Sequence, residues 1–242
     1  MLAILPPSRG QTSAPDGAAP LDLDSLALPE LASARRSVLD ALVGTPFQAH
    51  DLPAARAADV FTGVLYSAAG LPRILSRPGP AAQRATGDVL IASPLLGFVS
   101  PADRLPATRL AMGHVDGIGG LGGYWRPHLT AAIEQRAAGE LIVDVRSSEF
   151  TPLWKPPADA CWVSVRIVQD VDGTRRVVSH FAKHLRGVLI HHLLTRRGNE
   201  PTDLRSLVRA AQGLIRTGEI TGVESEPAQR AGQPHVLTLV SP

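Results

Sequence analysis

The chain has 242 residues, of which 44% are hydrophobic and 19% are charged, so it can bury a sizeable core and is not intrinsically disordered. No apolar run approaches the ~18 residues of a membrane span, and the first residues lack the basic region of a signal peptide. The single Cys161 excludes an internal disulfide. We therefore expect a cytoplasmic protein with no membrane partner.

The charge balance leaves the partner open. Lys and Arg number 24 against 22 Asp and Glu, and only Lys155 and Lys183 are lysines. Arginine binds phosphate or carboxylate groups with two parallel hydrogen bonds, which lysine cannot do, but GC-rich coding alone also produces an arginine bias. A nucleic-acid binder usually shows a concentrated basic stripe, which is not evident here.

The first part of the chain alternates apolar runs with turn-rich loops. Residues 2–5 form a short apolar run ended by Pro6-Pro7, which predicts a buried strand. Apolar residues at helical spacing predict a helix over 29–43, and residues 54–69 hold one or two more helices around 61–63.

Two further buried strands are predicted at 89–92 and 141–145, where short runs are almost entirely apolar. The region between them is rich in loops, with five glycines between 117 and 123. A helix is expected to begin near Pro127, because proline is favoured at the first helical position.

The last part of the chain reads as a hairpin followed by two helices. Residues 162–168 and 175–180 flank the turn signal Asp172-Gly173. An apolar face predicts a helix over 182–196, and Thr202 is expected to cap a helix that runs to about 216.

A closing strand at 236–240 completes the predicted elements. No segment between the elements has the composition of a linker, so residues 1–242 are expected to form one domain. The fold class is α/β (α+β), with a mixed sheet surrounded by helices.

Common cofactor and metal motifs are missing. The glycines at 117–123 loosely contain G-x-G-x-x-G, but no strand leads into them and no acid follows at the required spacing. Cys161 stands alone before an apolar run, and His191 and His192 point to different helix faces. We therefore expect no cofactor and no metal site.

Three polar segments are candidates for a binding site. Residues 144–150 directly follow a strand, where side chains of open α/β sheets face the ligand crevice. Residues 179–187 open a helix with basic side chains, which favours an anion. Arg104 and Arg109 lie in a turn-rich stretch. Each also has a plain explanation: a surface loop, a solvated first turn, or an ion pair with a nearby acid.

Taken in order, these and other segments resemble the YaaA peroxide-stress family, in its actinobacterial branch. The resemblance covers essentially the whole chain. Its marks are Leu5-Pro6-Pro7-Ser8, Val60-Phe61-Thr62-Gly63, Pro101-Ala102-Asp103-Arg104-Leu105, Arg109-Leu110-Ala111-Met112-Gly113, Tyr124-Trp125, Val143-Asp144-Val145-Arg146-Ser147-Ser148-Glu149-Phe150 and Val178-Ser179-His180-Phe181-Ala182-Lys183-His184-Leu185-Arg186-Gly187.

The resemblance implies a cytosolic protein that limits peroxide damage by lowering free intracellular iron. It also implies an α/β fold with a positively charged cleft, a helix-hairpin-helix-like element and DNA binding, without a settled catalytic mechanism. The hairpin candidate is the helix pair 182–196 and 202–216, whose turn contains only Gly198. The histidines show no ligand spacing for iron itself.

The chain departs from the family pattern at three positions. Arg9 stands where the family usually has an acid, Gln11 where it has a lysine, and Ser100 where it has an arginine. These changes fall in loops that we expect to face the cleft, so they favour an altered small-molecule specificity.

We expect the polar segments to converge on one cleft. Its expected anion or nucleic-acid contacts are Ser8, Arg104, Arg109, Arg146, Ser147, Ser179, Lys183 and Arg186, and its candidate catalytic residues are Glu149, His180 and Lys183.

Two functions fit this set. The first is nucleic-acid binding in the peroxide response, although few aromatic residues interleave the charges to stack bases. The second is a diverged enzyme in which Arg and Lys clamp a small anionic substrate while Glu149 or His180 transfers a proton. The partner is therefore DNA or a small anion, and the oligomeric state stays open.

Overall fold

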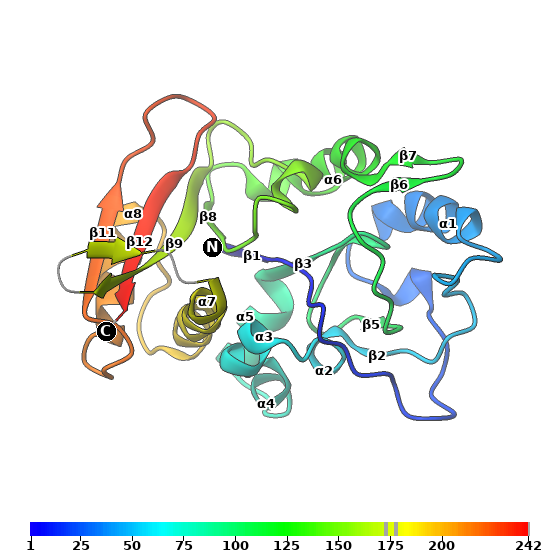
Figure 1. Cartoon of the computed structure of the whole chain (residues 1–242), viewed down its shortest axis with the longest axis horizontal. Coiled ribbons are helices and arrows are strands. Elements are labelled where there is room, and N and C mark those ends of the chain that lie inside the picture. The colour runs from blue at the N-terminus through cyan, green and yellow to red at the C-terminus, as the bar shows by residue number, and fades with distance from the viewer. Residues whose placement is uncertain (172–173, 177–178, 242) are drawn as a thin grey trace.

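The computed structural model describes residues 1–171, 174–176 and 179–241, with side chains for 1–169 and 181–241. One mixed sheet has the strand order β11-β12-β9-β8-β1-β3-β4, and β10 pairs with β9 beside this path (Figure 1). Its strands are β1 (Leu2–Leu5), β3 (Val89–Ser93), β4 (Gly97–Val99), β8 (Leu141–Asp144), β9 (Cys161–Val171), β10 (Thr174–Arg176), β11 (Gly222–Glu226) and β12 (His235–Ser241).

The centre of the sheet is parallel. Strands β12, β9, β8, β1 and β3 run in the same direction, and β11 and β4 are antiparallel to their neighbours at the two edges. Every residue of β1, β3 and β8 is buried. Covering on both faces explains why these strands are almost continuous apolar runs.

Helices flank the sheet, with α6 above the central strands and α3, α4, α5 and α7 below them in Figure 1. The helices are η1 (Leu23–Ser25), η2 (Pro29–Leu31), α1 (Ala32–Ala41), α2 (Ala57–Val60), α3 (Val64–Ala69), α4 (Leu71–Leu75), α5 (Pro80–Gly87), α6 (Leu121–Ala137), η3 (Thr151–Leu153), α7 (Ser179–Thr195), α8 (Leu204–Ala211) and η4 (Gln212–Leu214). Short pairs β2 (Ala55–Arg56) with β5 (Arg104–Leu105), and β6 (His114–Val115) with β7 (Gly119–Gly120), complete the fold.

Helices α3 and α7 pack with their backbones unusually close. A Cβ atom on Gly187 of α7 would lie 2.2 Å from the carbonyl oxygen of Leu65 and 2.7 Å from the Cβ of Ala68. Only a residue without a side chain fits there. This contact fixes the middle of α7 beside α3.

A buried arginine joins α1 to the strand edge. Arg35 is fully buried and donates hydrogen bonds to the carbonyl oxygens of Ala27, Leu28, Leu96 and Phe98. Burial lowers the pKa of its guanidinium to about 10.

The mixed α/β fold expected from the sequence is confirmed, and strands cover the runs at 2–5, 89–92, 162–168 and 236–240. The strand expected at 141–145 ends at Asp144. Strands β4 and β11 of this sheet were not predicted, nor were the two-residue strands β2, β5, β6 and β7.

Several boundaries were wrong. Helix α6 begins at Leu121, six residues before Pro127, because the buried Trp125 and Leu129 hold its first turns against the core. The expected strand 175–180 is β10 only to Arg176, and Ser179 already begins α7 rather than residue 182. Asp172-Gly173 and residues 177–178 lie outside the described residues.

The start of α8 also differs from the expectation. Asp203, not Thr202, is the N-cap, since its carboxylate accepts from the backbone N–H of Ser206 and the Ser206 hydroxyl accepts in return. The helix ends at Ala211 and continues as η4 to Leu214, so it is shorter than the predicted 202–216.

Candidate binding pocket

Three neighbouring parallel strands end at the same edge of the sheet, and a serine at or just after the end of each strand lines one cavity. Ser8 follows β1, Ser93 ends β3 and Ser147 follows β8. Ligands of open α/β sheets bind at the carboxyl ends of the strands. The cavity lies at this edge.

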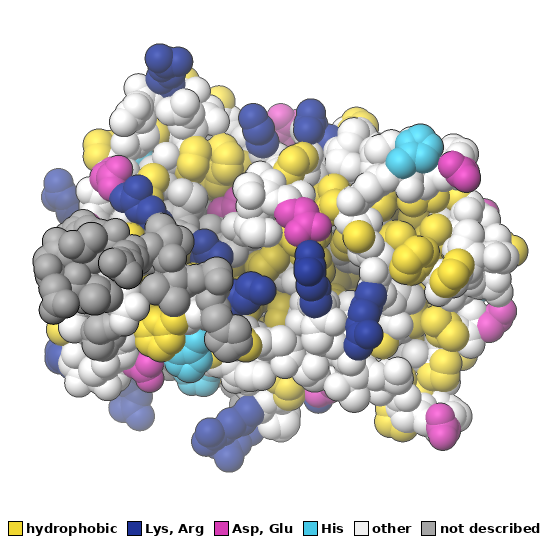
Figure 2. All heavy atoms as spheres, in the orientation of Figure 1, with side chains coloured by type: hydrophobic (Ala, Val, Ile, Leu, Met, Phe, Trp, Pro, Cys, Tyr) yellow, Lys and Arg dark blue, Asp and Glu magenta, His cyan; other side chains and the backbone are white. Residues whose placement is uncertain are grey.

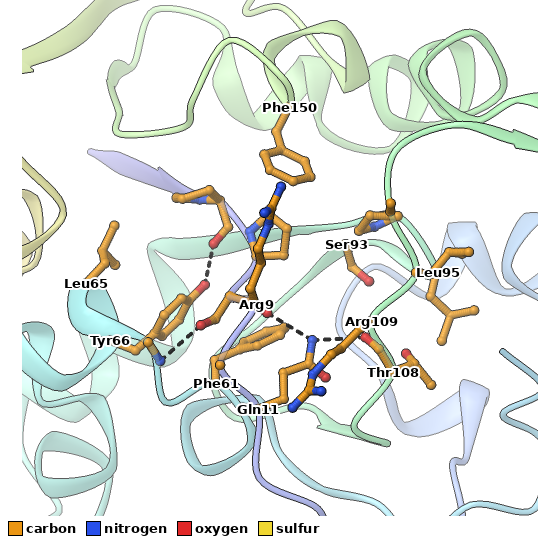
Figure 3. A pocket seen from close by; sticks show the side chains of 18 of the residues that line it. Arg9, Gln11, Phe61, Leu65, Tyr66, Ser93, Leu95, Thr108, Arg109 and Phe150 are labelled. Atoms are coloured by element: carbon orange, nitrogen blue, oxygen red, sulfur yellow. Dashed lines mark hydrogen bonds between the residues drawn. The ribbon is translucent and has the colours of Figure 1, made fainter. Parts of the chain in front are cut away.

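The cavity has a volume of about 690 Å³ and is shown in Figure 3. Six segments far apart in the chain form its wall: 6–11, 61–66, 93–96, 105–111, 147–150 and the α7 residues Lys183 and Arg186. Of the expected site residues, it contains Ser8, Arg109, Ser147, Glu149, Lys183 and Arg186.

Apolar side chains form part of the lining, and we call Phe61, Leu95, Leu96 and Phe150 together its apolar wall. The first three are each less than 5% exposed. Tyr66 donates a 2.6 Å hydrogen bond to the carbonyl oxygen of Pro6, and burial raises the pKa of its phenol well above the usual value. The phenol therefore stays neutral and holds the loop after β1 against α3.

The mouth is cationic. Arg9, Arg109, Lys183 and Arg186 line it, and Glu149 is the one carboxylate among the described lining residues. Figure 2 shows dark blue side chains gathered around the hollow in the middle of this face, with an acidic side chain among them. Such a rim attracts anions into the cavity.

Arg186 is the most deeply placed of these cations. Its Nε and Nη2 atoms donate to the carbonyl oxygen of Val165, at 3.4 and 3.1 Å. Burial lowers the pKa of Arg186, and the nearby Asp144 carboxylate counteracts this effect. An anion in the cavity would therefore relieve part of the cost of burying this charge.

Hydrogen bonds hold the two loops of the mouth together. The Gln11 side-chain Nε2 donates to the carbonyl oxygens of Ser8 at 3.0 Å and Thr108 at 2.9 Å. The Ser8 hydroxyl accepts from the backbone N–H of Gly63 at 3.0 Å. The loop that carries Arg109 is thus fixed to the loop that carries Arg9 (Figure 3).

Arg146 takes a different place from the one expected. Its side chain is buried, forms a two-pronged ion pair with Asp144, and also donates to the carbonyl oxygens of Phe150 and Trp154. It does not line the cavity. Its bonds instead hold the 147–150 segment against the end of β8.

The remaining expected residues lie outside the cavity lining or outside the described side chains. Arg104 is exposed on β5 and donates to the carbonyl oxygen of Ala54. Ser179 and His180 form the first residues of α7, but their side chains lie outside the described residues.

Several residues that line the cavity were not predicted as site residues. Arg9 and Gln11 were noted only as departures from the family, and Ser93, Phe61 and Phe150 were not proposed as site residues. Ser93 could have been found from the sequence, because it directly follows the apolar run at 89–92. Asp144 follows the apolar run at 141–143 in the same way.

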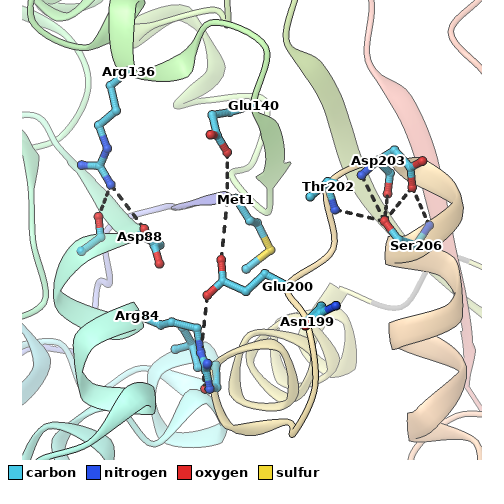
Figure 4. A network of polar contacts seen from close by, with 12 residues as sticks. Met1, Arg84, Asp88, Arg136, Glu140, Asn199, Glu200, Thr202, Asp203 and Ser206 are labelled. Carbon is cyan, nitrogen blue, oxygen red and sulfur yellow. Dashed lines mark hydrogen bonds and ion pairs between the residues drawn. The ribbon is translucent and has the colours of Figure 1, made fainter.

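A second polar network lies at the opposite, amino ends of the same strands (Figure 4). The Met1 ammonium group pairs with Glu140 at 2.8 Å, just before β8, and lies 3.9 Å from Glu200. Asp88, just before β3, pairs with Arg136 of α6. Charges therefore hold the edge of the sheet opposite the cavity.

None of the helices among the described residues is both long and apolar enough to cross a membrane. Within the same ranges, no three His, Cys, Asp or Glu side chains gather as a metal site would require.

Similarity to known proteins covers the whole chain. Residues 22–214 match the family described as "Peroxide stress protein YaaA". The chain is 33% identical to a UPF0246 protein of Streptomyces coelicolor, over 99% of this chain and 98% of that protein. It is 35% identical to a UPF0246 protein of Corynebacterium efficiens, over 99% and 100%.

A more distant UPF0246 protein, from Francisella philomiragia, is 27% identical over about half of each chain. The family match extends over most of the sequence and includes most of the segments that form the cavity. The chain therefore belongs to the YaaA peroxide-stress family.

Proposed function

We propose that this protein binds nucleic acid through the cationic mouth of the pocket and acts in the cytoplasmic response to hydrogen peroxide. The observation that carries the proposal is the gathering of Arg9, Arg109, Lys183 and Arg186 around one opening that holds a single carboxylate, Glu149. Family membership supports the peroxide role.

Three of these cations are free to bind phosphate. Among the described residues, Arg9, Arg109 and Lys183 have no hydrogen-bond or ion-pair partner, and all three are exposed. Arg186 donates through its Nε and Nη2 atoms, and among the described residues its Nη1 atom has no acceptor. Four phosphate contacts on a single strand would give a log–log salt slope of about −3.

Replacement of Lys183 tests this proposal. Lys183→Ala is expected to weaken binding to all oligonucleotide sequences alike and to flatten the salt slope by about 0.7 on a single strand, because one phosphate contact is lost. Fluorescence anisotropy over a salt series measures both effects. Cells that carry the variant are expected to survive hydrogen peroxide less well than cells with the unchanged protein.

Lys155→Ala is the matched control, since Lys155 is the other lysine of the chain, is exposed and does not line the pocket. It should leave the affinity and the slope unchanged. Equal losses in both variants would show that binding is not localised to the pocket, and a salt slope near zero would refute phosphate binding.

A second candidate function rests on the size of the cavity. Its volume of about 690 Å³ lies within the range of small-molecule sites, and Glu149 lines it together with Arg9, Arg109, Lys183 and Arg186. This combination suits an enzyme in which the cations clamp a small anionic substrate and Glu149 accepts a proton.

If the protein is such an enzyme, one anionic small molecule should raise its melting temperature. A ligand present at a hundred times its dissociation constant would add about 2.7 kcal/mol to the free energy of unfolding. Thermal melts against a panel of nucleotides and amino acids measure this effect. Glu149→Gln should then keep the shift in melting temperature and abolish turnover. If no compound of the panel raises the melting temperature, the enzyme hypothesis is rejected.

A further inference from the structure

We propose that the apolar wall of the pocket is a subsite for a nucleobase, so that the ligand held at the mouth is a nucleotide whose base is not stacked in a duplex. The inference rests on the proposed function and deepens it, because it names the chemical class that the cavity recognises. Charges at the mouth would hold the phosphate, and the wall would hold the base.

The apolar wall has the chemistry of a base-binding surface. A site for bare phosphate needs only donors and positive charge, yet this cavity is lined by Phe61, Leu95 and Phe150 as well. In Figure 3, Phe150 extends into the cavity from the upper side, while the ring of Phe61 lies at the lower side. The rings of Phe61 and Phe150 beside four cations were not expected from the sparse aromatic content of the chain.

One polar group, the hydroxyl of Ser93, lies beside this apolar wall. Ser93 is 7% exposed, and its hydroxyl oxygen accepts from the backbone N–H of Leu96 at 3.1 Å. Among the described residues nothing accepts the hydroxyl hydrogen. That hydrogen is therefore available to a carbonyl oxygen or ring nitrogen of a base.

The cavity is concave and has room for a base. Six segments of the chain line its volume of about 690 Å³, so part of a ligand can lie inside it. Bases within a duplex are stacked and paired, whereas an unpaired base can turn into a protein pocket and stack on aromatic side chains. A single-stranded or unpaired nucleotide therefore fits better than a regular duplex.

Two oligomers of equal length and charge test the subsite. One is oligothymidylate, and the other carries abasic residues on the same phosphate backbone. We expect the full-length protein to bind oligothymidylate roughly tenfold more tightly in fluorescence anisotropy, the scale that stacking of one base supplies.

Variants test whether the difference between the two affinities arises at the apolar wall. Phe150→Leu keeps apolar volume without the ring, and it should reduce the ratio of the two affinities toward one while the abasic oligomer binds as before. Lys183→Ala should weaken both oligomers alike. Phe47→Ala, at an exposed phenylalanine outside the pocket, is the matched control and should change neither affinity.

A free nucleotide distinguishes the source of the base. Thymidine 5′-monophosphate should raise the melting temperature of the protein more than deoxyribose 5-phosphate does. If the monophosphate has this effect and neither oligomer binds, the subsite binds the base of a free nucleotide, and the proposal of nucleic-acid binding fails.

The remaining outcomes overturn the inference. Equal affinities for oligothymidylate and the abasic oligomer would refute the base subsite and leave phosphate binding at the mouth intact. No binding of either oligomer, together with no effect of the monophosphate, would refute both the subsite and the proposed function.

Discussion

Gly187→Ala should destabilise the protein by about 3 kcal/mol, the upper end of the cost of overpacking a tight contact. The added Cβ would lie 2.2 Å from the carbonyl oxygen of Leu65, which belongs to the α3 backbone and cannot turn aside. Glycine to alanine in an open helix has the opposite effect and stabilises by about 1 kcal/mol. Denaturant unfolding followed by circular dichroism measures the difference.

Gly123→Ala is the matched control for this experiment. Gly123 also lies in a helix, α6, but nothing lies within 4 Å of the position that its Cβ would take. The change there should be neutral or stabilising. Similar effects at both positions would show that the close approach of α3 and α7 does not limit stability.

Arg35→Met should cost about 3–5 kcal/mol, which is a large share of the 5–15 kcal/mol that stabilises a typical domain. The substitution removes the donors to four carbonyl oxygens, those of Ala27, Leu28, Leu96 and Phe98. Each acceptor left buried without a partner is costly, and methionine fills the space without replacing any donor.

The loss of charge adds to this effect. Asp103 lies near Arg35, and burial already raises the pKa of its carboxyl group. Without the cation, Asp103 would be still harder to keep ionised. Urea unfolding at pH 7 measures the loss, and Arg36→Met, at the exposed neighbour on α1, should change stability by less than about 0.5 kcal/mol. Equal losses in the two variants would contradict a special role for Arg35.

The central strands could be predicted because burial on both faces leaves a simple apolar pattern. Residues 2–5 and 89–92 show that pattern directly. Strand β11 does not, since Gly222-Val223-Glu224-Ser225-Glu226 lies at the edge of the sheet and is largely exposed. The start of α6 was missed because tertiary packing of Trp125 overrides the low helix propensity of the glycines before it.

The candidate site was predictable to the extent that it follows the ends of strands. That rule correctly directed attention to residues 144–150, but it cannot tell which side chain of the segment turns outward. Asp144 is buried at the end of β8 and forms an ion pair with the buried Arg146, whereas Glu149 lines the cavity. The roles of Arg9 and Gln11 depend on how two loops meet, and no local pattern encodes that contact.

The position of β1 has a consequence for how the protein is made. This strand precedes the other strands of its sheet in the chain, yet it lies between β3 and β8, with Ala3 paired to both Val89 and Val143. On the ribosome at about 5–20 residues per second, its second partner emerges roughly ten seconds after the strand itself. During that interval this apolar segment lacks at least one of its two partner strands and is exposed to other nascent chains. Chaperone binding to this segment should therefore raise the yield of folded protein.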